Sequence, residues 1–238
     1  MAGRRTPTSV IVTIVLALLV AAGSVTAAAL MRPSGRSGAQ PSRSSTPAPA
    51  PDQGIDPSAC KRGPCKVLGT VMVAGTAVDL VADRDGTSGW LRIGGGGTGS
   101  GRVIETKITK LGVKLTHSSL QCQAGTISAC LIRGSYDGGV AGEVIVGRSD
   151  SWSPLETQFQ SSAGYLALSN VSGDAAPEIV AIQYDCQGAD ACSDGLVFGQ
   201  VFQANGTELG CTRHHYAKLE NMPGYPNIQL RGVAMVNC

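Results

Sequence analysis

Short runs of β-branched and apolar residues, separated by Gly, Asp and Asn, fill the sequence from Cys65 to the C-terminus. "AVDLVAD", "GEVIVGR" and "EIVAIQYD" are typical of these runs, and Asn205-Gly206 between two apolar runs is a strong hairpin signal. We find no 12-residue window that keeps a helical apolar period without Gly or Pro. The pattern therefore predicts an all-β domain.

Three stretches of the chain share one order of features: strand, acidic Gly-containing turn, strand, turn and strand. They begin at Ala77, Ser128 and Pro177, which are 51 and 49 residues apart, a period typical of four-stranded propeller blades. One further strand precedes each stretch, and the final "IQLRGVAMVNC" resembles that preceding strand, as if a fourth unit began there. The spacing predicts β-propeller-like repeats of about 50 residues, three units plus a closing strand. A β-sandwich with accidental periodicity is the alternative.

The N-terminal part of the chain has a different composition. Arg4 and Arg5 precede an uncharged run whose strongly apolar part, Val10–Met31, has 22 residues, the length that a helix needs to cross a bilayer. We therefore predict that residues 1–32 form a single-pass membrane anchor with the N-terminus in the cytoplasm. The small residues of "SVTAAAL" leave open a signal peptide cleaved near Ala27–Ala29, which would give a secreted protein.

Residues 33–59 are rich in Pro, Ser, Gly and Ala and contain one large apolar residue, Ile55. Such a segment cannot bury enough apolar surface to order itself, so we predict a disordered, semi-extended linker. The folded β domain is then expected over residues 60–238.

All eight cysteines lie in residues 60–238. An even number of cysteines behind a hydrophobic N-terminal segment predicts disulfides formed in an oxidising, extracytoplasmic compartment. The spacing favours Cys60–Cys65, Cys122–Cys130 and Cys186–Cys192, and leaves Cys211–Cys238 to hold the C-terminal tail. A metal site is the alternative, against which stand the absence of a C-x-x-C pair and the small number of histidines.

The charge balance excludes one class of partner. Residues 60–238 carry fourteen Lys and Arg against fifteen Asp and Glu, so the expected domain is close to neutral. Nucleic-acid binding requires a net positive surface. We expect no nucleic acid among the partners.

The stretch "LSNVSGDAAPEIVAI" resembles the loop-and-strand motif of the FG-GAP/VCBS repeat of bacterial extracytoplasmic proteins, whose blade hairpin carries an acidic calcium-binding loop. The resemblance implies calcium as a cofactor and places its ligands on five residues: Asn170, Ser172, Asp174, the backbone carbonyl of Ala176, and Glu178. Asn and Ser occupy positions where the family has carboxylates, so only two carboxylates remain. Calcium favours six to eight oxygen ligands, several of them carboxylate, so the affinity expected from this loop is poor.

No catalytic constellation stands out in the sequence. A triad would need His117 or His214 beside a nucleophile and a carboxylate, and no motif marks such a set. Aromatic residues in β-domain loops often contact sugars or protein partners, and Trp152, Tyr225 and Trp90 are the candidates here. We therefore expect an extracytoplasmic, membrane-tethered or secreted binding or adhesion module without catalysis, whose partner is a protein or glycan at the cell surface. A cell-envelope hydrolase and a purely structural envelope protein are the alternatives.

Overall fold

The computed structural model describes residue 60 and residues 62–94, 101–149, 151–186 and 195–238. The predicted anchor (1–32) and linker (33–59) lie outside these residues. Within the described ranges, no helix is long and apolar enough to cross a membrane. The described residues all belong to one compact unit.

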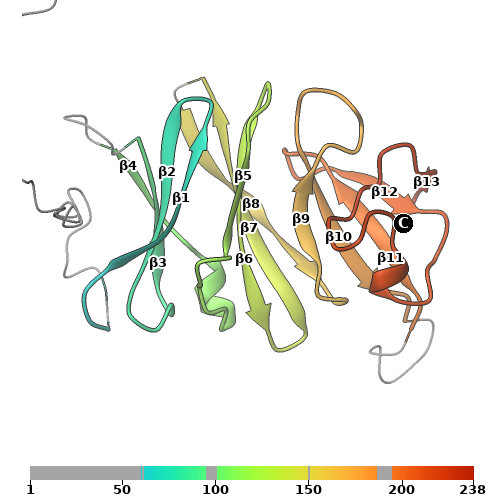
Figure 1. Ribbon diagram of the computed structural model, residues 1–238, viewed down its shortest axis with the longest axis horizontal. Helices are drawn as coiled ribbons and strands as arrows, with labels where there is room; N and C mark the ends of the chain where they lie inside the picture. The colour runs from blue at the N-terminus through green and yellow to red at the C-terminus, as the bar shows by residue number, and fades with distance from the viewer. Residues whose placement is uncertain (1–59, 61, 95–100, 150, 187–194) are drawn as a thin grey trace, which may run out of the picture. The chain divides into compact units, whose positions relative to one another are not determined.

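The described part of the unit contains three antiparallel sheets and two short 3-10 helices, which confirms the all-β class (Figure 1). Each sheet follows chain order, so that every strand pairs with the next one along the chain. The first sheet is β1 (Lys66–Val73), β2 (Thr76–Ala82), β3 (Gly89–Ile93) and β4 (Arg102–Glu105). The second is β5 (Leu120–Gln123), β6 (Ser128–Tyr136), β7 (Gly139–Arg148) and β8 (Ser151–Ser161). The third is β9 (Leu166–Ser169), β10 (Glu178–Tyr184), β11 (Val197–Phe202), β12 (Glu208–Thr212) and β13 (Met235–Val236). The 3-10 helices are η2 (Ile108–Leu111) and η4 (Leu219–Asn221).

Which side chains of a strand are buried depends on which faces of its sheet are covered by another sheet. Successive side chains of a strand point to opposite faces of the sheet. In β6, Leu131 packs with the third sheet and its neighbour Ile132 packs with the first. Strands such as β7 and β10 are covered on both faces, which explains why their sequences are nearly continuous apolar runs.

The sheets pack face to face in chain order through two apolar clusters (Figure 1). The first cluster joins Val78, Leu80 and Leu91 of the first sheet to Cys130, Ile132 and Ile145 of the second. The second cluster joins Leu131, Val144 and Phe159 of the second sheet to Leu166, Leu168 and Ile179 of the third. A third cluster lies on the far face of the third sheet, where Met222, Ile228 and Leu230 of the C-terminal segment cover Val180, Ile182 and Val201.

Each of the three predicted units, together with its preceding strand, corresponds to one sheet. None of these sheets closes into a barrel or a propeller, and the face-to-face packing of open sheets is consistent with a sandwich. The C-terminal segment does not begin a fourth unit. Only Met235–Val236 is a strand, and it pairs with β12 at the edge of the third sheet, where a disulfide holds the chain end.

Three disulfides join cysteines within the described ranges: Cys60–Cys65, Cys122–Cys130 and Cys211–Cys238. They are three of the four pairs favoured by the sequence spacing. Cys122 and Cys130 face each other on the paired strands β5 and β6, so their bond crosses a hairpin. Of the fourth pair, Cys186 is disulfide-bonded and Cys192 lies outside the described residues.

A buried carboxyl group holds the connection between the first two sheets. Glu143 of β7 is 4% exposed, and its Oε2 accepts a hydrogen bond from the backbone N–H of Lys107 at 2.8 Å. Its Oε1 is buried without a hydrogen-bond partner among the described residues. Burial raises the pKa of Glu143, and the Lys107 N–H and charge offset that effect only in part.

We predict that Glu143 makes stability depend on pH. Its folded-state pKa lies above its ordinary value of 4.5, so the folded protein binds this proton more tightly than the unfolded chain does. Stability should therefore rise as pH falls from 7 toward 4.5, and E143Q should remove this rise and increase the free energy of unfolding at pH 7. Urea unfolding between these pH values measures both effects. E105Q, which changes an exposed carboxylate of β4, is the control, and an equal slope in E143Q and the parent protein would contradict the prediction.

Candidate functional site

The five residues of the predicted calcium loop lie together in the turn that follows β9 and at the first residue of β10, and several of them form hydrogen bonds within the loop. Glu178 is 3% exposed, and its Oε2 accepts hydrogen bonds from the backbone N–H groups of Val171 at 2.7 Å and Ser172 at 3.4 Å. Its Oε1 accepts the Ser172 hydroxyl at 2.5 Å. The carboxylate thus ties the start of the loop to the start of β10.

Further hydrogen bonds join other groups of the loop, but Asn170 Oδ1 is buried without a hydrogen-bond partner among the described residues. Asp174 Oδ1 accepts the backbone N–H of Ala176 at 2.7 Å, and Asn170 Nδ2 donates to the carbonyl of Asp174. The described ranges hold no group of three or more His, Cys, Asp or Glu side chains placed to share a metal ion. Both carboxylates of the loop accept hydrogen bonds from neighbouring protein groups, and calcium favours six to eight oxygen ligands. Calcium binding by this loop stays a prediction.

We predict that Glu178 stabilises the fold without calcium. E178Q should lower the free energy of unfolding by about 1–3 kcal/mol, because the N–H and O–H donors of Val171 and Ser172 lose a charged acceptor. Calcium at about 10 mM, above the dissociation constants of weak extracellular sites, should leave the Tm unchanged. D174A, at an exposed position of the same loop, should have the smaller effect on stability. A rise in Tm with calcium that D174A abolishes would overturn this interpretation.

The structure does not bring the three aromatic candidates together. Trp152 is 6% exposed and packs in the first apolar cluster, so it is not placed to contact a ligand. Trp90 is half-buried on β3, opposite Val81. Tyr225 is 45% exposed in the C-terminal segment, next to Pro226.

Among the described residues, neither His117 nor His214, the histidines that a triad would need, pairs with a carboxylate. His117 is exposed, and His214 stacks edge-on against Tyr216 with ring centroids 4.6 Å apart. The acid–histidine contact that forms is a different one, between His215 Nδ1 and Asp185 Oδ2 at 2.9 Å. That pair also stacks on Phe198, through the His215 ring.

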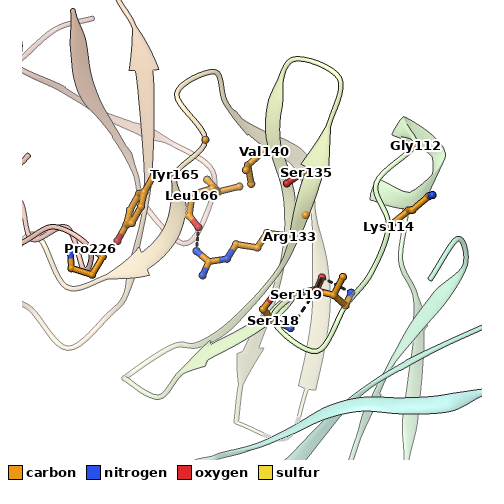
Figure 2. Close-up of a pocket in the computed structure, with 13 residues that line it drawn as sticks. Gly112, Lys114, Ser118, Ser119, Arg133, Ser135, Val140, Tyr165, Leu166 and Pro226 are labelled. Atoms are coloured by element: carbon orange, nitrogen blue, oxygen red, sulfur yellow. Dashed lines mark hydrogen bonds between the residues drawn. The ribbon is translucent and has the colours of Figure 1, made fainter. Parts of the chain in front are cut away.

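A groove of about 730 Å³ opens where β6 ends and β9 begins (Figure 2). One wall is the connection before β5, including Lys114, Ser118 and Ser119. The opposite wall is Tyr165, Leu166 and Pro226. Arg133 of β6 extends between these walls toward Leu166, whereas Lys114 points away from Arg133 (Figure 2).

Arg133 forms hydrogen bonds to both walls of the groove. Its backbone N–H donates to the carbonyl of Ser119 at 2.8 Å, and its Nη1 donates to the carbonyl of Leu166, the first residue of β9. Burial lowers the pKa of Arg133, and the neighbouring Tyr165 opposes that shift. Burial also raises the pKa of Tyr165, whose hydroxyl accepts the backbone N–H of Ile228 at 3.0 Å.

Hydroxyl groups make up much of the remaining lining. Ser119 Oγ accepts the backbone N–H of Thr116 at 2.9 Å, and the Thr116 and Ser118 hydroxyls lie 3.0 Å apart. The Ser135 side chain is exposed and makes no hydrogen bond to another described residue. The groove thus combines a partly desolvated cation with several groups that can both donate and accept hydrogen bonds.

Sequence reasoning did not find this groove because its walls come from segments far apart in the chain. The one local signal was a charge inside an apolar strand, Arg133 in "ACLIRGSY". Comparisons with known proteins add no constraint: no protein-family model, curated protein or solved structure matches this chain.

Proposed function

We propose that this chain is an extracytoplasmic binding module, membrane-tethered or secreted, which uses the groove beside Arg133 to recognise a ligand at the cell surface and has no catalytic activity of its own. The observation that carries the proposal is the groove itself. Its volume of about 730 Å³ lies in the range of ligand-binding pockets, and its polar groups converge from two sheets. The disulfides support a location in an oxidising compartment.

We also propose that the three sheets are related blades of the FG-GAP/VCBS type. The support is that each sheet is a chain-order meander and that the sequence units are offset by 51 and 49 residues. Blades arranged around an axis would hold β1, β5 and β9 along its inner side. Spin-label distances test this arrangement, because the β1–β9 distance should be clearly shorter than the sum of the β1–β5 and β5–β9 distances. Equality with the sum would indicate a straight stack.

The binding function is tested by filling the groove. S135W places a large ring at an exposed lining position, and S153W places the same ring at an exposed position of β8 outside the groove. The full-length chain and both variants are incubated with isolated bacterial cell-wall fragments. We expect S135W to weaken binding by about tenfold or more and S153W to leave it unchanged, with equal Tm values. Equal binding by S135W and the parent chain would exclude the groove as the site.

A further inference from the structure

Among the residues that the structure describes, none places a carboxylate against the charge of Arg133. Its guanidinium contacts a backbone carbonyl, and no acidic side chain lines the groove. Arg92 shows the usual solution for a buried arginine: its Nε and Nη2 each lie 2.9 Å from Asp79 Oδ2, and both side chains are 12% exposed. Removing an arginine from water without a counter-charge is unfavourable, and an anion in the groove would compensate that loss.

The geometry of Arg133 suits an oxyanion. A guanidinium carries five N–H donors in a plane, and the contact with Leu166 uses only Nη1. The other donors are not buried without partners, so they remain accessible from the groove. A carboxylate or phosphate can accept two parallel hydrogen bonds from such a fork.

The rest of the groove suits a sugar ring rather than a bare ion. Its volume far exceeds that of an inorganic anion, and Thr116, Ser118 and Ser135 present hydroxyls that can pair with the hydroxyls of a saccharide. Tyr165 and Pro226 line the opposite wall (Figure 2) and add a phenol and an apolar ring to the groove.

We propose that the groove binds an acidic saccharide, with Arg133 holding the carboxylate or phosphate oxygens and the groove hydroxyls pairing with the sugar. This inference rests on the proposed binding function and names its ligand class. The carboxylate and phosphate forms share the same contact with Arg133, so the experiment compares both.

The test is calorimetric titration of the full-length chain with four probes: a galacturonic acid tetramer, the neutral galactose tetramer, glucose 6-phosphate and a glutamate tetrapeptide. We expect at least one acidic saccharide to bind about tenfold or more tightly than the neutral tetramer and the peptide. R133M retains the side-chain length without the charge and should weaken that binding by a similar factor. R148M removes an exposed arginine at the far end of β7 and should leave binding unchanged.

The outcomes distinguish a failure of the proposed ligand class from a failure of the proposed binding function. Binding by R133M equal to that of the parent chain, tighter binding of the peptide, or no binding of either acidic saccharide would overturn the inference. A purely structural Arg133 would show a lower Tm in R133M with unchanged affinity, which would also overturn it. If S135W loses cell-wall binding while R133M keeps it, the binding function stands and the acidic ligand does not; if both variants bind cell walls normally, both proposals fail.

Discussion

Replacing Phe159 by alanine is expected to lower the free energy of unfolding by about 3–5 kcal/mol. Phe159 lies on β8, is 2% exposed and packs in the cluster that joins the second sheet to the third. Its ring also meets Phe202 of β11 edge to face, with centroids 5.2 Å apart, and such pairs add about 0.5–1.5 kcal/mol to the burial term. The truncation would therefore leave a cavity between the two sheets and remove an aromatic pair at once.

Urea unfolding followed by far-UV circular dichroism measures this loss. F198A is the matched control, because Phe198 is half-buried on β11 and stacks on His215 outside the cluster that joins the sheets. We expect F198A to cost clearly less than F159A. Equal losses in the two variants would mean that the second and third sheets do not depend on this cluster for their packing.

The sequence was sufficient to predict the strands because their signals are local. Leu131 and Ile132 are adjacent, apolar and both fully buried, which is possible for a strand only when both faces of its sheet are covered. The same reasoning applies to "EIVAIQYD", of which Glu178–Tyr184 forms β10. The Cys122–Cys130 disulfide could be predicted for the same reason, because the two cysteines are close in the sequence and face each other across the hairpin of β5 and β6.

The sequence did not predict where the C-terminal segment packs. "IQLRGVAMVNC" resembles the first strand of a unit, yet its residues Ile228 and Leu230 pack on the far face of the third sheet. An apolar face without a following sheet must be covered by other residues, and nothing in the local pattern says which residues do so. The burial of Trp152 could not be predicted either, because it depends on the first sheet packing over this residue.

The candidate site was hidden for a related reason. A groove is a property of distant segments, so Arg133, Ser119 and Leu166 could not be associated from their positions in the chain. The calcium loop was visible because it is contiguous, but its motif does not reveal that Val171 and Ser172 occupy the Glu178 carboxylate. Residue types at a given spacing indicate which ligands are possible, whereas their hydrogen bonds decide which remain free.

Opening the Cys211–Cys238 disulfide is expected to destabilise the protein by about 3–4 kcal/mol, because the bond closes a long loop in the unfolded chain. The variant is C211A/C238A, and C122A/C130A is the control. The cysteines of the control bond are 8 residues apart, whereas Cys211 and Cys238 are 27 apart. The shorter loop restricts the unfolded chain less, so removing the control bond should cost about 2.5 kcal/mol. Urea unfolding of both double variants measures the difference, and a larger loss in C122A/C130A would contradict the expected order.

The C-terminal disulfide should also matter for the groove. The segment that it encloses carries Pro226, which lines the groove, and Ile228, whose N–H donates to the Tyr165 hydroxyl at 3.0 Å. A freed chain end opens locally at lower cost than the core does, so we expect faster hydrogen exchange at Ile228 and weaker cell-wall binding in C211A/C238A but not in C122A/C130A. If the Ile228 amide stays protected in C211A/C238A, then the burial of Met222, Ile228 and Leu230 is by itself enough to hold this wall of the groove in place.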